Sequence, residues 1–84
     1  MVKESAPSIE GTVSKGGQPA GGVYVRLVGP SGEFVAERYT QDDGNFTFHV
    51  TDGIWTIEAR AAGADTAKQA VEVHGENASV HVDL

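Results

Sequence analysis

The sequence predicts an all-β protein, a single antiparallel β-sandwich of seven strands. Apolar and polar residues alternate in short segments, which is the pattern of strands that are buried on one face only. Turns that contain glycine separate these segments. A chain of 84 residues, 11 of them glycine, has room for one such domain with one modest core.

The first two expected strands alternate regularly. Residues 8–14 form the first, and the double glycine at residues 16–17 turns the chain. Residues 22–28 form the second, whose alternation leaves Tyr24 and Arg26 on the outer face. The inward positions of these two strands are Ile9, Gly11, Val13, Val23, Val25 and Leu27.

The third expected strand, residues 33–40, has no register that the sequence fixes. Phe34 and Ala36 compete with Val35 and Tyr39 for the inner face. A shift by one residue would exchange the two faces. If Phe34 and Ala36 are buried, Tyr39 joins the outward residues of the second strand.

Two Asp-Gly turns introduce the next two strands. Asp43-Gly44 precedes the fourth strand, residues 45–50, and Asp52-Gly53 precedes the fifth, residues 54–60. Such turns reverse antiparallel strands, so these segments extend the sandwich. Their inward positions are Phe46, Phe48, Val50, Trp55, Ile57 and Ala59.

The last two expected strands, residues 67–74 and 79–84, would form a hairpin about residues 75–78. That hairpin places Glu72 opposite His81 on the outer surface. Such a pair suits a surface ion pair, which is the simpler interpretation, or a metal ligand with its supporting residue. The alternation also turns His49 and His74 outward. The inward positions are Val71, Val73, Val80, Val82 and Leu84.

The composition argues against several classes of function. Twelve acidic residues and six basic ones give a net charge of −6, the wrong sign for neutralising phosphates, so we expect no binding to nucleic acid or to a membrane. The sequence has no cysteine, which favours a reducing compartment. Residues 1–7, expected to be a flexible N-terminus before the sandwich domain of residues 8–84, lack the apolar core of a signal peptide. We therefore expect a cytoplasmic protein.

Four motifs together carry a resemblance that covers nearly the whole chain. They are Gly11-Thr12-Val13, Gly21-Gly22 before the second strand, the segment from Thr40 to Phe48, and Gly53-x-Trp55-x-Ile57-x-Ala59. With them the chain resembles a carboxypeptidase regulatory-like domain, a sandwich of the transthyretin (prealbumin) type.

Three segments narrow the resemblance: residues 21–27, 31–37 and 53–56. They are similar to a small actinobacterial family of unassigned biochemical activity. That family is linked to thiosulfate sulfurtransferases, which are rhodanese-type enzymes, largely through gene association. The resemblance therefore implies a role in sulfur metabolism with a sulfurtransferase as protein partner.

No arrangement of residues in the sequence indicates catalysis. Without cysteine the chain has no thiolate to carry sulfur, and none of its serines lies in a nucleophile elbow. The hydrolases of 5-hydroxyisourate, which share the transthyretin fold, carry a C-terminal Tyr-Arg-Gly-Ser signature, whereas this chain ends in His81-Val82-Asp83-Leu84. Pilin and adhesin relatives close a Lys–Asn bond with a core glutamate, but Ala59 stands at that position between the candidates Lys15 and Asn77.

A metal site receives little support from the turn around Gly44. Asp42, Asp43 and Asn45 offer oxygen ligands, but calcium needs about six to eight of them. Aspartate and asparagine beside glycine are ordinary turn residues. We therefore expect no metal and no cofactor.

The leading hypothesis is a non-enzymatic accessory or protein-binding domain, whose partner-binding residues are Tyr24, Arg26 and Tyr39. Tyrosine and arginine combine contact area with directional hydrogen bonds, and both are enriched among the residues that dominate interfaces. Cross-strand packing on a sheet surface is the alternative reading of these residues. The alternative function is a carbohydrate- or small-ligand-binding module of a larger or secreted protein. A metal-dependent enzyme that uses Glu72, His74 and His81 is a minor third hypothesis.

Overall fold

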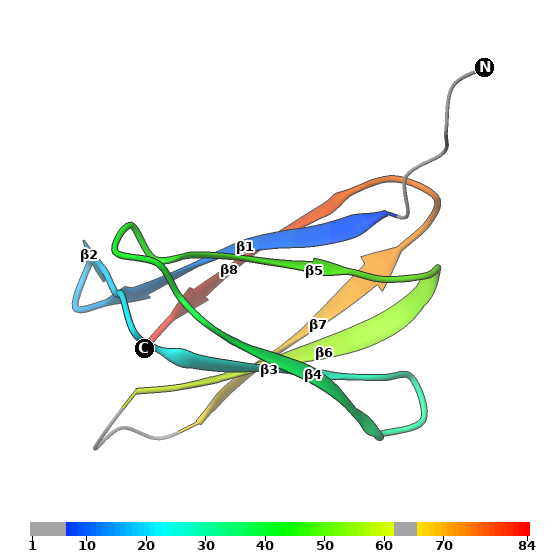
Figure 1. Cartoon of the computed structure of the whole chain (residues 1–84), viewed down its shortest axis with the longest axis horizontal. Coiled ribbons are helices and arrows are strands. Elements are labelled where there is room, and N and C mark those ends of the chain that lie inside the picture. The colour runs from blue at the N-terminus through cyan, green and yellow to red at the C-terminus, as the bar shows by residue number, and fades with distance from the viewer. Residues whose placement is uncertain (1–6, 62–65) are drawn as a thin grey trace.

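A computed structural model describes residues 7–61 and 66–84 and confirms the predicted sandwich (Figure 1). Over these residues it contains strands and no helix, so none that is long and apolar enough to cross a membrane. The strands are β1 (Ser8–Lys15), β2 (Gln18–Pro19), β3 (Tyr24–Val28), β4 (Phe34–Tyr39), β5 (Asn45–His49), β6 (Gly53–Arg60), β7 (Ala67–Val73) and β8 (Ala78–Asp83).

The strand count is eight rather than seven because of β2. This strand of two residues pairs with the end of β1 directly after the predicted double-glycine turn, where Gly16 and Gly17 have φ of 60° and 83°. Two residues are too few to produce an alternating pattern, so this strand could not be predicted from alternation. Of the expected flexible segment, residues 1–7, only Pro7 is described, and its carbonyl oxygen accepts the N–H of Val50 at 2.9 Å.

Two four-stranded sheets form the layers of the sandwich. In the first, called sheet A, β1 lies at the centre. The strands β5 and β2 both lie along the same side of β1. The N–H of Val13 donates to the carbonyl of Gly44, just before β5, and the carbonyl of Val13 accepts from the N–H of Ala20, just after β2. Both groups belong to one residue of β1, so they point to one side of that strand. The other side of β1 pairs with β8 in parallel. The second sheet, called sheet B, has the antiparallel order β4-β3-β6-β7.

The expected hairpin between the last two strands is wrong, since β7 belongs to sheet B and β8 to sheet A. The connection between them crosses from one layer to the other, held at both ends by side chains. Asp52 Oδ1 accepts the N–H of Gly75 at 2.7 Å, and Asn77 Oδ1 accepts the N–H of Ser8 at 3.0 Å. These contacts join residues that are far apart in the sequence, so no local pattern could reveal them.

The core between the sheets consists of the residues that the alternation turns inward. Val80 and Leu84 differ from the rest, because they are only partly buried. Gly11 is also buried, and the ring of Phe46 occupies the space beside it. The buried hydrophobic residues are Ile9, Val13, Val23, Val25, Leu27, Phe46, Phe48, Val50, Trp55, Ile57, Ala59, Val71, Val73 and Val82.

Strand β4 resolves the register that the sequence left open. Ala36 pairs with Leu27 and packs against the core. Phe34 pairs with Val28, and the β-bulge between these two pairs leaves Val35 without a partner on β3. Phe34 is therefore 55% exposed, and Tyr39 is 66% exposed. The bulge explains why neither simple register was right for the whole strand: Ala36 is inward and Tyr39 outward as one register required, but Phe34 is not buried with Ala36.

Candidate interaction surfaces

Two rows of polar and aromatic side chains cross the outer face of sheet B. In the first row, Tyr24 lies between Tyr39 of β4 and Arg60 of β6. The second row alternates in charge across all four strands. Alternating signs on neighbouring strands stabilise a sheet surface and fix its side chains relative to one another. The members of the second row are Glu37, Arg26, Glu58 and Lys68.

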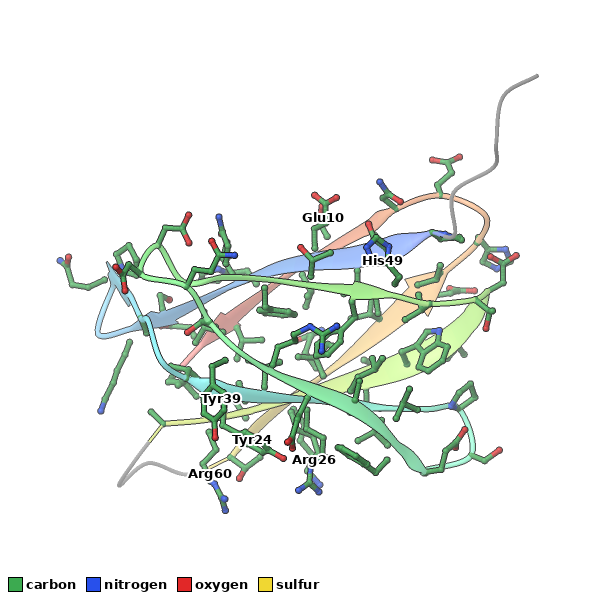
Figure 2. All side chains as sticks on the ribbon, viewed as in Figure 1. Glu10, Tyr24, Arg26, Tyr39, His49 and Arg60 are labelled. Carbon is green, nitrogen blue, oxygen red and sulfur yellow. The ribbon has the colours of Figure 1, made fainter. Side chains whose placement is uncertain are left out.

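Four residues of this face form a compact group that we call the aromatic–arginine patch: Phe34, Tyr39, Tyr24 and Arg26. The two tyrosine rings lie 5.6 Å apart at an interplanar angle of 57°. The guanidinium carbon of Arg26 lies 5.7 Å from the ring centre of Tyr24 and 5.3 Å from that of Phe34, both within cation–π range. Figure 2 shows Tyr24, Arg26 and Tyr39 gathered on one side of the sandwich, together with Arg60.

Hydrogen bonds also hold the patch in place. The hydroxyl of Tyr24 donates to the carboxylate of Glu37, and Nη2 of Arg26 donates to the Tyr24 oxygen at 3.4 Å. The hydrogen bond with Tyr24 raises the pKa of Arg26 above its ordinary value, and the nearby carboxylates of Glu58 and Glu37 act in the same direction. Arg26 is therefore cationic at any pH at which the protein is studied.

A small hollow of about 90 Å³ lies beside the patch. Tyr24 and Arg26 line one side of it, and Glu58, Arg60 and Thr66 complete it. The guanidinium groups of Arg26 and Arg60 and the hydroxyl of Thr66 offer donors around this hollow, and the carboxylate of Glu58 is an acceptor within it. The hollow suits a single polar side chain rather than a whole small molecule, because ligand pockets usually measure about 300 Å³ or more.

The outer face of sheet A is hollowed by a larger groove of about 530 Å³, which is lined by polar side chains together with Phe46, Val80 and Gly11. It lies on the opposite side of the sandwich from the patch, where Glu10 and His49 project in Figure 2. Three strands contribute residues in register, so the groove runs across β5, β1 and β8. Its polar side chains are Glu10, Thr12, Asn45, Thr47, Ser79 and His81.

His81 is fixed at one end of this groove by contacts with two hydroxyl groups. Its Nδ1 lies 2.7 Å from the hydroxyl of Thr12, and its Nε2 lies 3.1 Å from the hydroxyl of Ser14. Ser14 donates its only proton to Asp83 Oδ1 at 2.9 Å. The Ser14 oxygen therefore accepts from Nε2, which leaves Nδ1 of the neutral ring to accept the proton of Thr12.

The expected pair of Glu72 with His81 does not form. The strands β7 and β8 lie in different sheets. Glu72 instead contacts His74, two residues further along the chain, with Oε2 of the glutamate 2.8 Å from Nε2 of the histidine. Both side chains are largely exposed. The third histidine, His49, is exposed on β5. The structure thus keeps Glu72 and His74 together, but it does not bring His81 to them as the metal-dependent hypothesis would require.

Two of the three candidate calcium ligands around Gly44, Asp43 and Asn45, bind one another within the turn. Asp43 accepts the backbone N–H of Asn45 through Oδ1 at 3.0 Å and the side-chain amide of Asn45 through Oδ2 at 2.8 Å. Over residues 7–61 and 66–84, no three histidine, cysteine, aspartate or glutamate side chains come close enough to hold a metal ion.

Sequence reasoning placed Tyr24 and Arg26 on the outer face and allowed Tyr39 there, and the structure brings all three together. It missed Phe34, because the bulge that turns this side chain outward leaves no mark in the alternation. It also missed Thr12 and Ser14 as partners of His81, since these contacts require β1 beside β8. The threonine and serine at alternate positions of β1 were the available signal, but exposed hydroxyls are common on strands.

Comparison with known proteins places the chain in a family. The family described as "Protein of unknown function (DUF1416)" matches residues 2–84. The chain belongs to the DUF1416 family. Its relatives include the uncharacterized protein Rv0814c of Mycobacterium tuberculosis, which is 40% identical over 63 residues, or 74% of this chain and 63% of that protein. An uncharacterized protein of Mycolicibacterium smegmatis is 38% identical over 63 residues, 74% of this chain and 70% of that protein. The chain thus spans less than two thirds of the length of the M. tuberculosis relative.

Solved structures confirm that this DUF1416 chain has a transthyretin-like fold. The 5-hydroxyisourate hydrolase of Klebsiella pneumoniae superposes with a TM-score of 0.74 over 92% of this chain and 88% of the hydrolase, at 20% sequence identity. The dioxygenase domain of a dioxygenase carbohydrate-binding protein fusion from Streptomyces sp. SirexAA-E gives a TM-score of 0.66 at 15% identity, over 98% of this chain and 79% of that one. At these identities the likeness concerns the fold alone.

Proposed function

We propose that this DUF1416 chain is a non-enzymatic accessory domain that binds a protein partner through the aromatic–arginine patch. The observation that carries the proposal is the arrangement of Phe34, Tyr39, Tyr24 and Arg26 on one exposed sheet face. Aromatic and arginine side chains are enriched at protein interfaces and dominate the binding energy of many of them.

The internal contacts of the patch support a binding role further. Arg26 is held between two rings, and Tyr24 is hydrogen-bonded on both sides, to Arg26 and to Glu37. Side chains that are already ordered lose less entropy when a partner covers them. The patch therefore has large and pre-positioned contact groups, of which Phe34 and Tyr39 are exposed and Tyr24 and Arg26 are half-buried, and a binding surface requires such groups.

The first partner to test is a cytoplasmic rhodanese-type thiosulfate sulfurtransferase, the partner that the family resemblance implies. The absence of cysteine fits a division of labour in which the enzyme carries sulfur on its own thiolate and this chain only binds it. In that arrangement the accessory domain would position or stabilise the enzyme, without taking part in the transfer.

Binding of a purified sulfurtransferase from the source organism, measured by calorimetry, tests the proposal. We expect saturable binding to the wild-type chain and a loss of at least about tenfold in affinity for the Tyr24→Ala, Arg26→Ala double variant. A His49→Ala, Thr47→Ala variant changes the opposite face and should bind like wild type. No binding to any sulfurtransferase would reject this partner. If affinity capture from the native lysate also recovers no protein that depends on the patch, the protein-binding role itself is rejected.

The groove on sheet A favours a second candidate, the binding of a carbohydrate or another small polar ligand. Its volume of about 530 Å³ is in the range of ligand pockets, and its hydroxyl, amide, carboxylate and imidazole groups match the hydroxyls of a sugar. A glycan array with wild type and a Glu10→Gln, Asn45→Ala variant tests this candidate. Binding that the double variant retains would place the ligand elsewhere.

A further inference from the structure

One side of the sandwich is open between the edge strands of the two sheets. On this side β7 ends sheet B and β8 ends sheet A, and among the described strands none pairs with the free edge of either. The two strands, orange and red in Figure 1, contact one another across a hollow of about 350 Å³. Residues from the middle of both strands line it, including Ala70 of β7 and Val80 of β8.

The free edge of β8 presents unpaired backbone groups at alternate residues. The N–H of Leu84 donates to the carbonyl of Ser14 at 2.7 Å, so the backbone of Leu84 faces β1. Residues two apart in a strand face the same side, which turns the backbone groups of Ser79, His81 and Asp83 away from β1. An edge of this kind is a template for another strand.

The sequence of β8 is complementary to itself in one antiparallel register. With a two-fold axis at Val80, Ser79 lies opposite His81 of a second copy, and the same pair recurs on the other side of the axis. Both residues have outward-facing backbone groups, so each pair can exchange two hydrogen bonds. Val80, which is only partly buried in the single chain, would cover its own counterpart. No like charges meet in this register.

The sequence of β7 is complementary to itself in the same way. With the axis at Ala70, Lys68 lies opposite Glu72 of a second copy, and the pair again occurs twice. In the single chain Glu72 already contacts His74 through Oε2, and its second oxygen is free to accept from a lysine. Opposite charges directly across two strands are stabilising. Because Ala70 and Val80 line the same hollow, one axis through it can serve both strands.

The other open side of the sandwich does not offer such edges. There β4 is interrupted by the bulge at Val35, which is a common protection against strand pairing. The guanidinium carbon of Arg38 also reaches from β4 to within 5.5 Å of the ring centre of Phe48 on β5 and covers the gap. Self-pairing is therefore favoured at β7 and β8 specifically.

We propose that the partner of this open side is a second copy of the chain, which pairs antiparallel through β7 and β8. Each sheet would continue into its counterpart, four strands from each copy. Ser79 and His81, which line the polar groove on sheet A, would lie next to the same residues of the second copy. The two grooves would then form one site to which both copies contribute. This inference is independent of the function proposed for the patch.

Sedimentation equilibrium of the purified full chain over a range of concentrations tests the proposal. We expect a reversible dimer, twice the chain mass of 8.8 kDa. Val80→Lys places two lysines together at the axis and should yield a monomer, since lysine on an edge strand opposes pairing. Glu72→Lys places the new lysine opposite Lys68 of the second copy and should raise the dissociation constant by at least about tenfold.

Charge reversal distinguishes this interface from a general loss of acidity. Adding Lys68→Glu to Glu72→Lys restores opposite charges and should recover dimerisation. Asp42→Lys makes the same change of charge in the turn before β5 and should leave the dimer unchanged. Circular dichroism and thermal melting show that each variant is folded. A wild-type chain that is monomeric over the whole range of concentrations overturns the proposal. The β8 edge would then be free for a strand of another protein. A dimer that resists both Val80→Lys and Glu72→Lys also overturns the proposal.

Discussion

Adding one methyl group at Gly11 should displace the ring of Phe46 from the core. Gly11 and Phe46 are directly paired across β1 and β5, and both are buried. A Cβ atom at Gly11 would lie 2.1 Å from Cζ of Phe46 and 2.5 Å and 2.7 Å from its two Cε atoms. These distances are far below van der Waals contact. The glycine therefore provides the space that the phenyl ring fills, and Gly11→Ala removes that space.

The expected loss of stability depends on how far the ring of Phe46 has to move. Overpacking a core usually costs about 1 to 3 kcal/mol, and complete loss of a buried phenylalanine about 3 to 5 kcal/mol. The ring is only 4% exposed and is 5.8 Å from Phe48, so it cannot rotate away without disturbing a second ring. We expect Gly11→Ala to lower the free energy of unfolding by about 2 to 4 kcal/mol. A domain of this size has about 4 to 13 kcal/mol in total.

A double-mutant cycle with urea denaturation isolates this contact. Phe46→Ala alone should be severely destabilising, because it leaves a cavity. In the Phe46→Ala background, Gly11→Ala should cost less than about 1 kcal/mol, since the methyl group then has room and alanine restricts the unfolded chain. An equal cost of Gly11→Ala in both backgrounds would refute the reasoning, because the loss would then arise from the backbone of β1 and not from the ring.

Four further substitutions test the same structure by thermal or urea denaturation. Trp55→Ala should cost about 3 to 5 kcal/mol because it empties a large core position, and a cost below about 1 kcal/mol would contradict the burial of this ring. Gly44→Val should cost about 2 to 4 kcal/mol, since φ is +81° and a Cβ would lie 2.5 Å from the carbonyl oxygen of Val13; an unchanged melting temperature would argue against this turn. Thr40→Val keeps the shape of a buried side chain but removes an oxygen that makes two backbone hydrogen bonds, so we expect a loss of about 1 to 3 kcal/mol, and a neutral result would contradict both bonds. His81→Ala should cost less than about 1 kcal/mol because its contacts are exposed, and a loss above about 2 kcal/mol would show a buried or bound histidine.

Local patterns were sufficient to predict most of the sandwich. Alternation identified seven strands and the faces that they bury, because each strand has one side on a single core. The predicted turns at Gly16-Gly17 and at Gly44 occur, with the positive φ that favours glycine. Trp55, Ile57 and Ala59 alternate inward along β6 as expected.

The remaining features depend on contacts between distant residues. The parallel pairing of β1 with β8 and the separation of β7 from β8 are choices of topology, and the same alternation fits a hairpin equally well. The bulge at Val35 moves Phe34 outward, and only the structure shows it. For this reason the sequence placed Tyr24, Arg26 and Tyr39 correctly on one face but did not reveal Phe34 or the network around His81.

The pairing of β1 with β8 also determines how the chain can fold. The centre of sheet A joins strands whose contacting residues, such as Thr12 and His81, are 69 positions apart. A contact of such separation forms late and slows folding, because the loop between the strands must first be closed. During synthesis the edge of β1 that pairs with β8 remains unpaired until β8 has left the ribosome. The chain should therefore reach its native state only after the whole domain has been made, and until then the open edge of β1 is where misfolding and aggregation would start.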